Sequence, residues 1–250
     1  MEYYLQNKGG AFCGILNGID LDVWNPKTDP DVPKKYDASS FSLKKENKTI
    51  VQKILGLAID PDATLLALVG RLAQQKGIDV VAECISSLPP NCQLAILGDG
   101  DEKYKMLLTG LRNGREKQFS LTIALDEKLA RKLYAASDAF LLPSRFEPCG
   151  LTQMYSYRYG TLPIVFPVGG LFDTVKDFSA GGHGFVCERN GINSHGFINK
   201  INQALNIRHN NPKIWKSRAI EAMSLDFGWG KSIKTVLSLY DYLVKGIFPA

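Results

Sequence analysis

Short apolar runs alternate with segments of helical pattern from residue 64 onward, and this alternation restricts the fold more than any other feature. Parallel strands buried on both faces have such continuous apolar runs, and strands separated by helices of about ten residues form parallel sheets with right-handed crossovers. The sequence therefore predicts an α/β fold with a doubly wound parallel sheet. The expected strands are 65–69, 93–97, 119–125, 139–142, 162–166 and 184–187.

The expected helices are identified by apolar positions at helical spacing and by their end signals. Asp126 stands where an N-cap is expected, one residue ahead of a helical pattern. The predicted helical segments are 44–57, 78–88, 102–111, 126–136, 150–159, 171–178, 194–207, 212–223 and 229–244.

Composition excludes several classes of function. The chain has 250 residues, 45% of them hydrophobic and 22% charged, as in an ordinary globular protein. No apolar run is long enough to cross a bilayer, so no membrane partner is expected. A net charge of +5 without clustered basic and aromatic residues does not indicate nucleic acid. The five cysteines form no Cys-x-x-Cys pair and the three histidines lie far apart, so we expect reduced thiols and no metal site.

The run P-S-R-F-E-P-C-G-L, residues 143–151, follows the predicted strand 139–142. It therefore lies at the carboxyl end of a strand, where open α/β sheets bind ligands. Glu147 stands in this turn, and a helix start just after it would attract phosphate. A sugar joined to a phosphate would satisfy both groups, but Glu147 could also simply cap the helix. The amides expected to face the ligand are those of Cys149, Gly150, Leu151 and Thr152.

Two other strand ends carry candidate ligand groups. Arg71 and Lys76 follow strand 65–69, and two cations in one turn can clamp a diphosphate, although an isolated pair is more often a surface feature. Gly169 and Gly170 follow strand 162–166, where a bare backbone admits a ligand or simply makes a turn. The segment 98–100 lacks the full G-x-G-x-x-G pattern of a dinucleotide-binding fingerprint. It is interpreted as a turn in which glycines allow a close approach to the backbone.

Several motifs in order resemble one family, that of bacterial glycogen synthase and plant starch synthase. They are G-I-L-N-G-I-D (14–20), W-N-P-x-T-D (24–29), N-K-x-x-x-Q-K-x-L-G-L (47–57), V-G-R-L-x-x-Q-K-G (69–77), P-S-R-F-E-P-C-G-L-T-Q (143–153), Y-G-T-L-P-I-V (159–165) and G-G-L-x-D-T-V (169–175). The resemblance covers nearly the whole chain, but only the family's C-terminal, nucleotide-sugar-binding domain. It implies a Rossmann-like sheet that forms the C-terminal half of a two-domain GT-B-type glycosyltransferase.

The resemblance also implies the reaction and the residue roles. The family is a hexosyltransferase family that transfers glucose, with retention, from ADP-glucose to the non-reducing end of an α-1,4-glucan, without a metal or other cofactor. Arg71 and Lys76 would hold the diphosphate, and Glu147 would favour positive charge at the anomeric carbon of glucose. The residues expected to line the donor pocket are Asn17, Cys149, Gly150, Leu151, Thr152, Gly169 and Gly170.

The same resemblance predicts how the chain is divided. Residues 1–20 would end the N-terminal domain, 21–228 would bind the nucleotide sugar, and 229–250 would pack back on the N-terminal domain. An ordinary amphipathic helix is the alternative for that last segment. The 250 residues contain no Lys-x-Gly-Gly-Leu segment, which opens the family's N-terminal domain. We therefore expect part of a larger synthase, inactive alone, located in the cytoplasm or, in a plant or alga, in the plastid stroma.

Tyr155 stands where related retaining transferases often hold a ribose-binding glutamate, but the glycogen synthase family commonly lacks that glutamate, so this position supports the narrower assignment. Two further departures leave the donor open: Val168 replaces a threonine, which removes a hydroxyl near the phosphates, and Leu125 replaces an aromatic residue that stacks on the base. A UDP-sugar-dependent transferase of the same architecture therefore stays a second hypothesis. A non-catalytic module that binds a nucleotide sugar or a glucan is the third.

Overall fold

The protein is described from a computed structural model, which describes residue 7 and residues 13–245. These residues belong to two compact units. One unit is Asp22–Leu225, and the other combines Met1–Leu21 with Asp226–Ala250. Each unit is treated by itself below.

The larger unit contains one six-stranded sheet in the order β3-β2-β1-β4-β5-β6. Every neighbouring pair of strands is parallel, which confirms the predicted doubly wound sheet. The chain builds outward from β1 to β3 and then returns to the other side of β1 with β4. The direction in which the chain adds strands to the sheet thus reverses between β1 and β4. Such a switch point leaves a crevice at the carboxyl ends of the strands. The strands are β1 (Thr64–Val69), β2 (Cys92–Gly98), β3 (Phe119–Ile123), β4 (Ala139–Leu142), β5 (Leu162–Val165) and β6 (Phe185–Val186).

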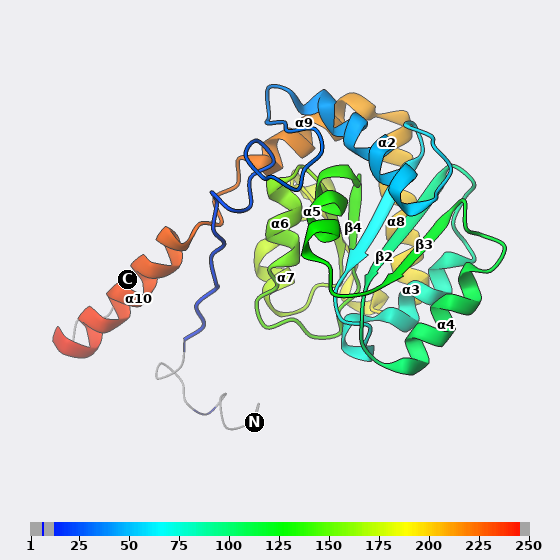
Figure 1. The fold of residues 1–250 in the computed structure, drawn as a ribbon. Coiled ribbons are helices and arrows are strands. Elements are labelled where there is room, and N and C mark those ends of the chain that lie inside the picture. Colours follow the sequence, from blue (N-terminus) through cyan, green and yellow to red (C-terminus); the bar gives the residue numbers. More distant parts are fainter. Residues whose placement is uncertain (1–6, 8–12, 246–250) are drawn as a thin grey trace. The chain divides into compact units, whose positions relative to one another are not determined.

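Helices cover both faces of this sheet (Figure 1). Helices α2 and α5 contact each other on one face, and α3 and α8 contact each other on the opposite face. The helices are α2 (Lys44–Leu55), α3 (Ile78–Ile85), α4 (Glu102–Arg112), α5 (Glu127–Ala136), α6 (Thr152–Arg158), α7 (Gly169–Thr174), α8 (Ser194–Asn210) and α9 (Pro212–Met223). Short 3-10 turns are η2 (Phe41–Leu43), η3 (Gln74–Lys76), η4 (Phe178–Ala180) and η5 (Arg189–Gly191).

The core explains why the central strand β1 is apolar after Thr64. Leu65 and Ala67 of β1 belong to a buried cluster that also holds Val51 of α2 and Leu133 of α5. The neighbouring residue Leu66 is also fully buried, although its side chain points to the other face of the sheet. A strand covered on both faces cannot carry polar residues at alternate positions, so β1 has the sequence T-L-L-A-L-V.

Two helices begin two residues away from their predicted start. Helix α6 begins at Thr152 instead of residue 150, and Gly150 has a left-handed φ of +71°, far from the right-handed torsions of an α-helix. Helix α7 begins at Gly169 and ends at Thr174, so the predicted span 171–178 is wrong at both ends. Both shifts alter the loops at the carboxyl ends of β4 and β5.

A polar network lies at the opposite, amino end of the sheet. Asp138, just before β4, bonds to Lys48 at 2.6 Å and to Arg208 at 2.9 Å. Lys44 is buried, and its ammonium lies 2.8–3.1 Å from three backbone carbonyls and from the Thr161 hydroxyl. Burial lowers the pKa of Lys44. The network thus joins α2, α8 and the start of β4 through charge-assisted hydrogen bonds.

We expect part of the stability of this unit to be lost on acidification below about pH 4. Burial alone would raise the pKa of Asp138, but Lys48 and Arg208 outweigh it and hold this pKa below its ordinary value. The folded state therefore binds fewer protons than the unfolded state. The stabilisation is fully present above the unfolded pKa of about 3.9 and is lost as the pH falls through the folded pKa.

Urea unfolding of the wild type and of Asp138→Asn, from about pH 7 to about pH 2.5, checks this expectation. The difference in the free energy of unfolding should shrink below about pH 4. Asp241→Asn, at an exposed position, should show no such trend. A difference for Asp138→Asn that stays constant down to the lowest pH contradicts the assignment.

The smaller unit contains helix α10 (Trp229–Lys245). The backbone amide of Ile19 donates to the carbonyl of Phe227 at 2.8 Å, and the Ser232 hydroxyl donates to the carbonyl of Leu16 at 2.7 Å, which ties the two segments of this unit together. Helix α10 carries one apolar stripe within this unit, whose members follow helical spacing and are all exposed. They are Trp229, Ile233, Leu237, Tyr240 and Leu243. In the described part of the chain, no helix combines the length and the apolar character that a membrane span requires.

Candidate functional site

The loops after β1, β4 and β5 meet at the switch point of the sheet, and glycines allow their contact. A Cβ atom on Gly77 would lie 2.1 Å from the carbonyl oxygen of Pro143. A Cβ on Gly169 would lie 2.0 Å from the oxygen of Glu147, and one on Gly170 would lie 1.8 Å from the oxygen of Cys149. Contacts this short exclude any larger residue unless the backbone moves. The three loops therefore form one packed surface at the carboxyl edge of the sheet.

Lys76 and Glu147 form the centre of this surface. The ammonium of Lys76 lies 2.5 Å from the Glu147 carboxylate, and the Ser144 hydroxyl donates to the same carboxylate oxygen at 3.2 Å. The side chains of Lys76 and Glu147 are 29% and 12% exposed, so the ion pair is largely sheltered from water. Helix α6 has no side-chain cap, and its N-cap residue is Leu151. The interpretation of Glu147 as a helix cap is therefore wrong.

Arg71 lies on the same loop as Lys76 but faces another strand end. Its side chain is 70% exposed, and its guanidinium lies 3.8 Å from the carboxylate of Asp101, which follows β2. The structure thus brings Lys76 to Glu147 and leaves Arg71 turned away from that pair. An exposed side chain of this length can rotate at little cost.

Arg71 also borders a hollow of about 800 Å³ at the carboxyl ends of β1, β2 and β3. Lys105 lies on its wall and bonds to Asp99 at 2.7 Å. Leu125 is 90% exposed beside it, and Asp126 caps α5 by accepting from the amide of Leu129 at 2.9 Å, as predicted. The predicted close approach at 98–100 is confirmed, since Cβ atoms on Gly98 and Gly100 would lie 1.9 Å and 2.4 Å from backbone oxygens of the β1 loop.

Arg145 and Gln153 support this surface, and neither was predicted from the sequence. Arg145 forms two hydrogen bonds of 2.7 and 2.6 Å with Asp79, and a third of 2.8 Å with the carbonyl of Gln74. Hydrogen bonding to Asp79 raises the pKa of Arg145. The buried Gln153 amide donates to the carbonyls of Cys149 and Gly150 at 3.1 and 2.8 Å. Both residues stand inside the motif 143–153, which was the signal available.

The residues predicted to line a donor pocket are found in three places. Cys149, Gly150 and Leu151 lie in the loop ahead of α6, and Thr152 begins that helix. Gly169 and Gly170 begin α7 against this loop, with the Gly170 amide donating to the carbonyl of Glu147 at 2.9 Å. Asn17 belongs to the smaller unit, so its place in the pocket stays a prediction. Among the described residues, no group of three or more His, Cys, Asp or Glu side chains is arranged to hold a metal ion.

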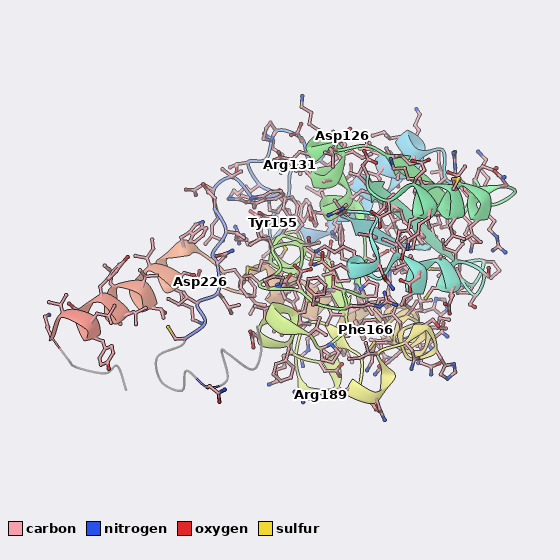
Figure 2. All side chains as sticks on the ribbon, turned by 90° about the horizontal axis from the view of Figure 1, so that it is seen from below. Asp126, Arg131, Tyr155, Phe166, Arg189 and Asp226 are labelled. Carbon is pink, nitrogen blue, oxygen red and sulfur yellow. The ribbon has the colours of Figure 1, made fainter. Side chains whose placement is uncertain are left out.

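Tyr155, at the position where related transferases often hold a glutamate, packs in an aromatic cluster. It stacks on Trp24 with ring centres 3.6 Å apart, and the guanidinium of Arg131 lies 4.2 Å from the Trp24 ring. Figure 2 labels Arg131 and Tyr155 on the two helices, α5 and α6, that contribute to this cluster. Burial raises the pKa of Tyr155. The position is thus occupied by a packing residue instead of a carboxylate.

These features define a doubly wound α/β domain with a cation–carboxylate pair at its switch point, the place where such domains bind ligands. Comparison with known proteins gives the family. The model of the family "Glycosyl transferases group 1" matches residues 53–222. The chain therefore belongs to the group 1 glycosyl transferases, and its sheet has the Rossmann-like fold of a GT-B glycosyltransferase.

Similar proteins agree with this assignment. A glycogen synthase of Aromatoleum aromaticum is 41% identical over 96% of this chain, which covers 49% of that protein. The catalytic domain of starch synthase IV from Arabidopsis thaliana, in a structure bound to ADP and acarbose, is 34% identical with a TM-score of 0.91. That match covers 97% of this chain and 51% of the other. A sucrose-phosphate synthase from Thermosynechococcus elongatus, 21% identical with a TM-score of 0.68 over 98% of this chain and 57% of that one, shares the fold. The chain spans about half the length of the curated relatives it matches.

Proposed function

We propose that this chain is the donor-binding half of a retaining α-1,4-glucan synthase that takes glucose from ADP-glucose. The observation that carries the proposal is the sheltered Lys76–Glu147 pair at the switch point. A carboxylate held beside a cation suits a ligand that joins a diphosphate to a sugar whose anomeric carbon becomes positive. Similarity to a starch synthase whose structure contains ADP supports the choice of nucleotide.

Electrostatic stabilisation of the leaving group is the main catalytic effect in this proposal. As the bond between glucose and diphosphate breaks, negative charge grows on the departing ADP and positive charge grows on the sugar. Lys76 and Arg71 stabilise the first charge and Glu147 stabilises the second. The Lys76 ammonium has three N–H donors, and one already bonds to Glu147, so the others are available to phosphate oxygens.

Arg71 completes the clamp by leaving its weak contact with Asp101. A contact of 3.8 Å at an exposed position is worth about 0–1 kcal/mol, so the phosphate can compete for this guanidinium. The amides from Cys149 to Thr152 and the bare backbone of Gly169 and Gly170 lie next to Glu147 and would contact glucose and phosphate. Gln153 holds the backbone of that loop in place.

The hollow beside Arg71 is the proposed site of the base and the ribose. Its volume of about 800 Å³ lies within the range of small-molecule pockets. Leu125 offers the base an apolar contact without the stacking that an aromatic ring provides. UDP-glucose is the competing donor for that reason, and a non-catalytic module that binds a nucleotide sugar or a glucan is the other alternative.

The acceptor and the second half of the enzyme complete the proposal. We propose that an α-1,4-glucan and an N-terminal domain are partners, with Asn17 lining the donor pocket and α10 contacting that domain. Arg71 and Lys76 supply the positive charge that a metal would supply elsewhere, so we expect EDTA to leave ADP binding unchanged. A cytoplasmic location, or the plastid stroma in a plant or alga, fits this function.

Calorimetry of this chain with ADP, AMP and UDP tests the proposal. Arg71→Ala or Lys76→Ala should weaken ADP binding by about 1–3 kcal/mol, the range of a hydrogen bond to a charged group, and should weaken AMP binding less. Lys53→Ala, an exposed lysine of α2, is the control and should change neither affinity. Equal losses for AMP and ADP would show that these cations do not hold the terminal phosphate. Tighter binding of UDP than of ADP would favour the UDP-sugar alternative.

A further inference from the structure

A second cavity, of about 620 Å³, opens at the amino ends of the strands. Three residues just ahead of strands line it: Asp62 lies two residues before β1, Asp138 directly before β4 and Gly160 two residues before β5. Its walls come from the start of α2, the end of α8 and the start of α9. We call it the amino-end pocket. The candidate donor site lies at the carboxyl ends, so the two are separate places on this unit.

The amino-end pocket carries an excess of positive charge. Five lysine or arginine side chains line it, against the two carboxylates of Asp62 and Asp138. Lys48 and Arg208 share Asp138 as their anionic partner. Lys44 is not needed for this excess, because burial lowers its pKa and the other four cations still outnumber the two carboxylates. The charge of the pocket is therefore not balanced by its own carboxylates, and an anion is the ligand that such a site attracts.

Two of the cations are placed to contact a ligand directly. Lys45 is exposed, and its only ion pair among the described residues is with Asp62, whose side chain is 84% exposed. Such a pair is worth about 0–1 kcal/mol and gives way readily to a stronger anion. Lys216 is exposed on α9 and makes no ion pair with any residue that the structure describes. Helix α9 begins at Pro212 without a side-chain cap, so its positive end adds to the field of Lys216.

The remaining walls are apolar. Phe41, Pro61 and Trp215 line the pocket beside the cations, and Trp215 stacks on Phe185, which fixes its ring. An apolar wall can pack against the C–H groups of a sugar, while lysines bind phosphate. A volume of about 620 Å³ lies in the range of small-molecule pockets. We infer that the amino-end pocket binds a phosphate monoester of a sugar, through Lys45 and Lys216 on the phosphate and the apolar wall on the sugar.

This inference does not rest on the proposed function, and its test is designed to be independent of it. All proteins carry Lys76→Ala, which removes the central cation of the donor site. Thermal shift and calorimetry use glucose 6-phosphate as the probe, with inorganic phosphate and glucose as partial probes. Saturable binding of glucose 6-phosphate is expected, weaker binding of phosphate, and none of glucose. Absence of saturable binding by glucose 6-phosphate overturns the inference.

Matched charge reversals locate the binding. Lys45→Glu with Lys216→Glu should weaken glucose 6-phosphate binding roughly tenfold or more. Lys53→Glu with Lys213→Glu reverses exposed lysines on the same two helices outside the pocket, and binding should be unchanged. Circular dichroism confirms that both variants are folded. Equal losses in the two variants would show a nonspecific charge effect and would also overturn the inference.

The phosphate ester can come from a free sugar phosphate or from a phosphorylated glucan chain. The same titration with a phosphorylated and an unphosphorylated α-glucan separates these sources. Tighter binding of the phosphorylated glucan than of glucose 6-phosphate identifies a polymer site, and the reverse order identifies a small-molecule site. Both orders support a phosphate ester as the ligand, whereas equal binding of the two glucans excludes the polymer.

Discussion

Glu147→Gln should lower kcat by about 10²- to 10³-fold and leave the affinity for ADP nearly unchanged. The substitution keeps the shape of the side chain and removes the negative charge that would stabilise the sugar in the transition state. ADP has no sugar at that position, and Lys76 stays available to its phosphates. A loss confined to kcat is the signature of a group that acts on transition-state charge.

Incorporation of radiolabelled glucose into glycogen, by this chain combined with the proposed N-terminal domain, gives kcat, and calorimetry gives the ADP affinity. Glu116→Gln, an exposed glutamate near β3, should change neither quantity. Ser144→Ala, which removes the hydroxyl that bonds to Glu147, should have a smaller effect than Glu147→Gln. If kcat is unchanged while the melting temperature falls, Glu147 has a structural role and the mechanism is wrong.

Asp29→Asn should destabilise the larger unit by about 3–5 kcal/mol, the usual cost of removing one partner of a buried ion pair. Asp29 is buried, bonds to Arg131 at 3.1 Å and accepts a hydrogen bond from the Tyr159 hydroxyl. Its loss leaves the Arg131 cation, whose side chain is 9% exposed, beside a neutral amide.

Urea unfolding at neutral pH measures this change. Glu127→Gln is the matched control, because Glu127 pairs with the same Arg131 but its side chain is 69% exposed. The Glu127→Gln substitution should lower the free energy of unfolding by less than about 1 kcal/mol. Equal destabilisation by the two substitutions would contradict the assignment of Asp29 as the buried partner.

The sheet was predictable because burial on both faces leaves a simple pattern. Strand β4 was predicted to the residue, since the run 139–142 is apolar and is followed at once by a turn. The start of α6 was not predicted correctly, because the sequence does not reveal that Gly150 adopts a left-handed φ. Helical pattern alone continues through such a glycine, and the backbone torsion decides where the helix begins.

The candidate site was predictable at the level of strand ends and less so at the level of side chains. Lys76 and Glu147 were each predicted as ligand groups at strand ends, but their ion pair was not, because the sequence does not give the order of the strands in the sheet. The turn of Arg71 toward Asp101 depends on side-chain torsions that no spacing rule fixes. Gln153 acts through backbone carbonyls of its own loop, and this kind of contact has no sequence signature.

The glycine contacts between the strand-end loops bear on the redesign of donor specificity. With the Cβ position of Gly77 only 2.1 Å from the Pro143 oxygen, and that of Gly170 only 1.8 Å from the Cys149 oxygen, each loop backbone shapes the space left for the next. A loop grafted singly from another transferase would collide with its neighbour. In the proposed donor site, exchange of the sugar donor therefore requires the three loops to be transplanted together, whereas the exposed Leu125, proposed to lie beside the base, belongs to none of these glycine contacts.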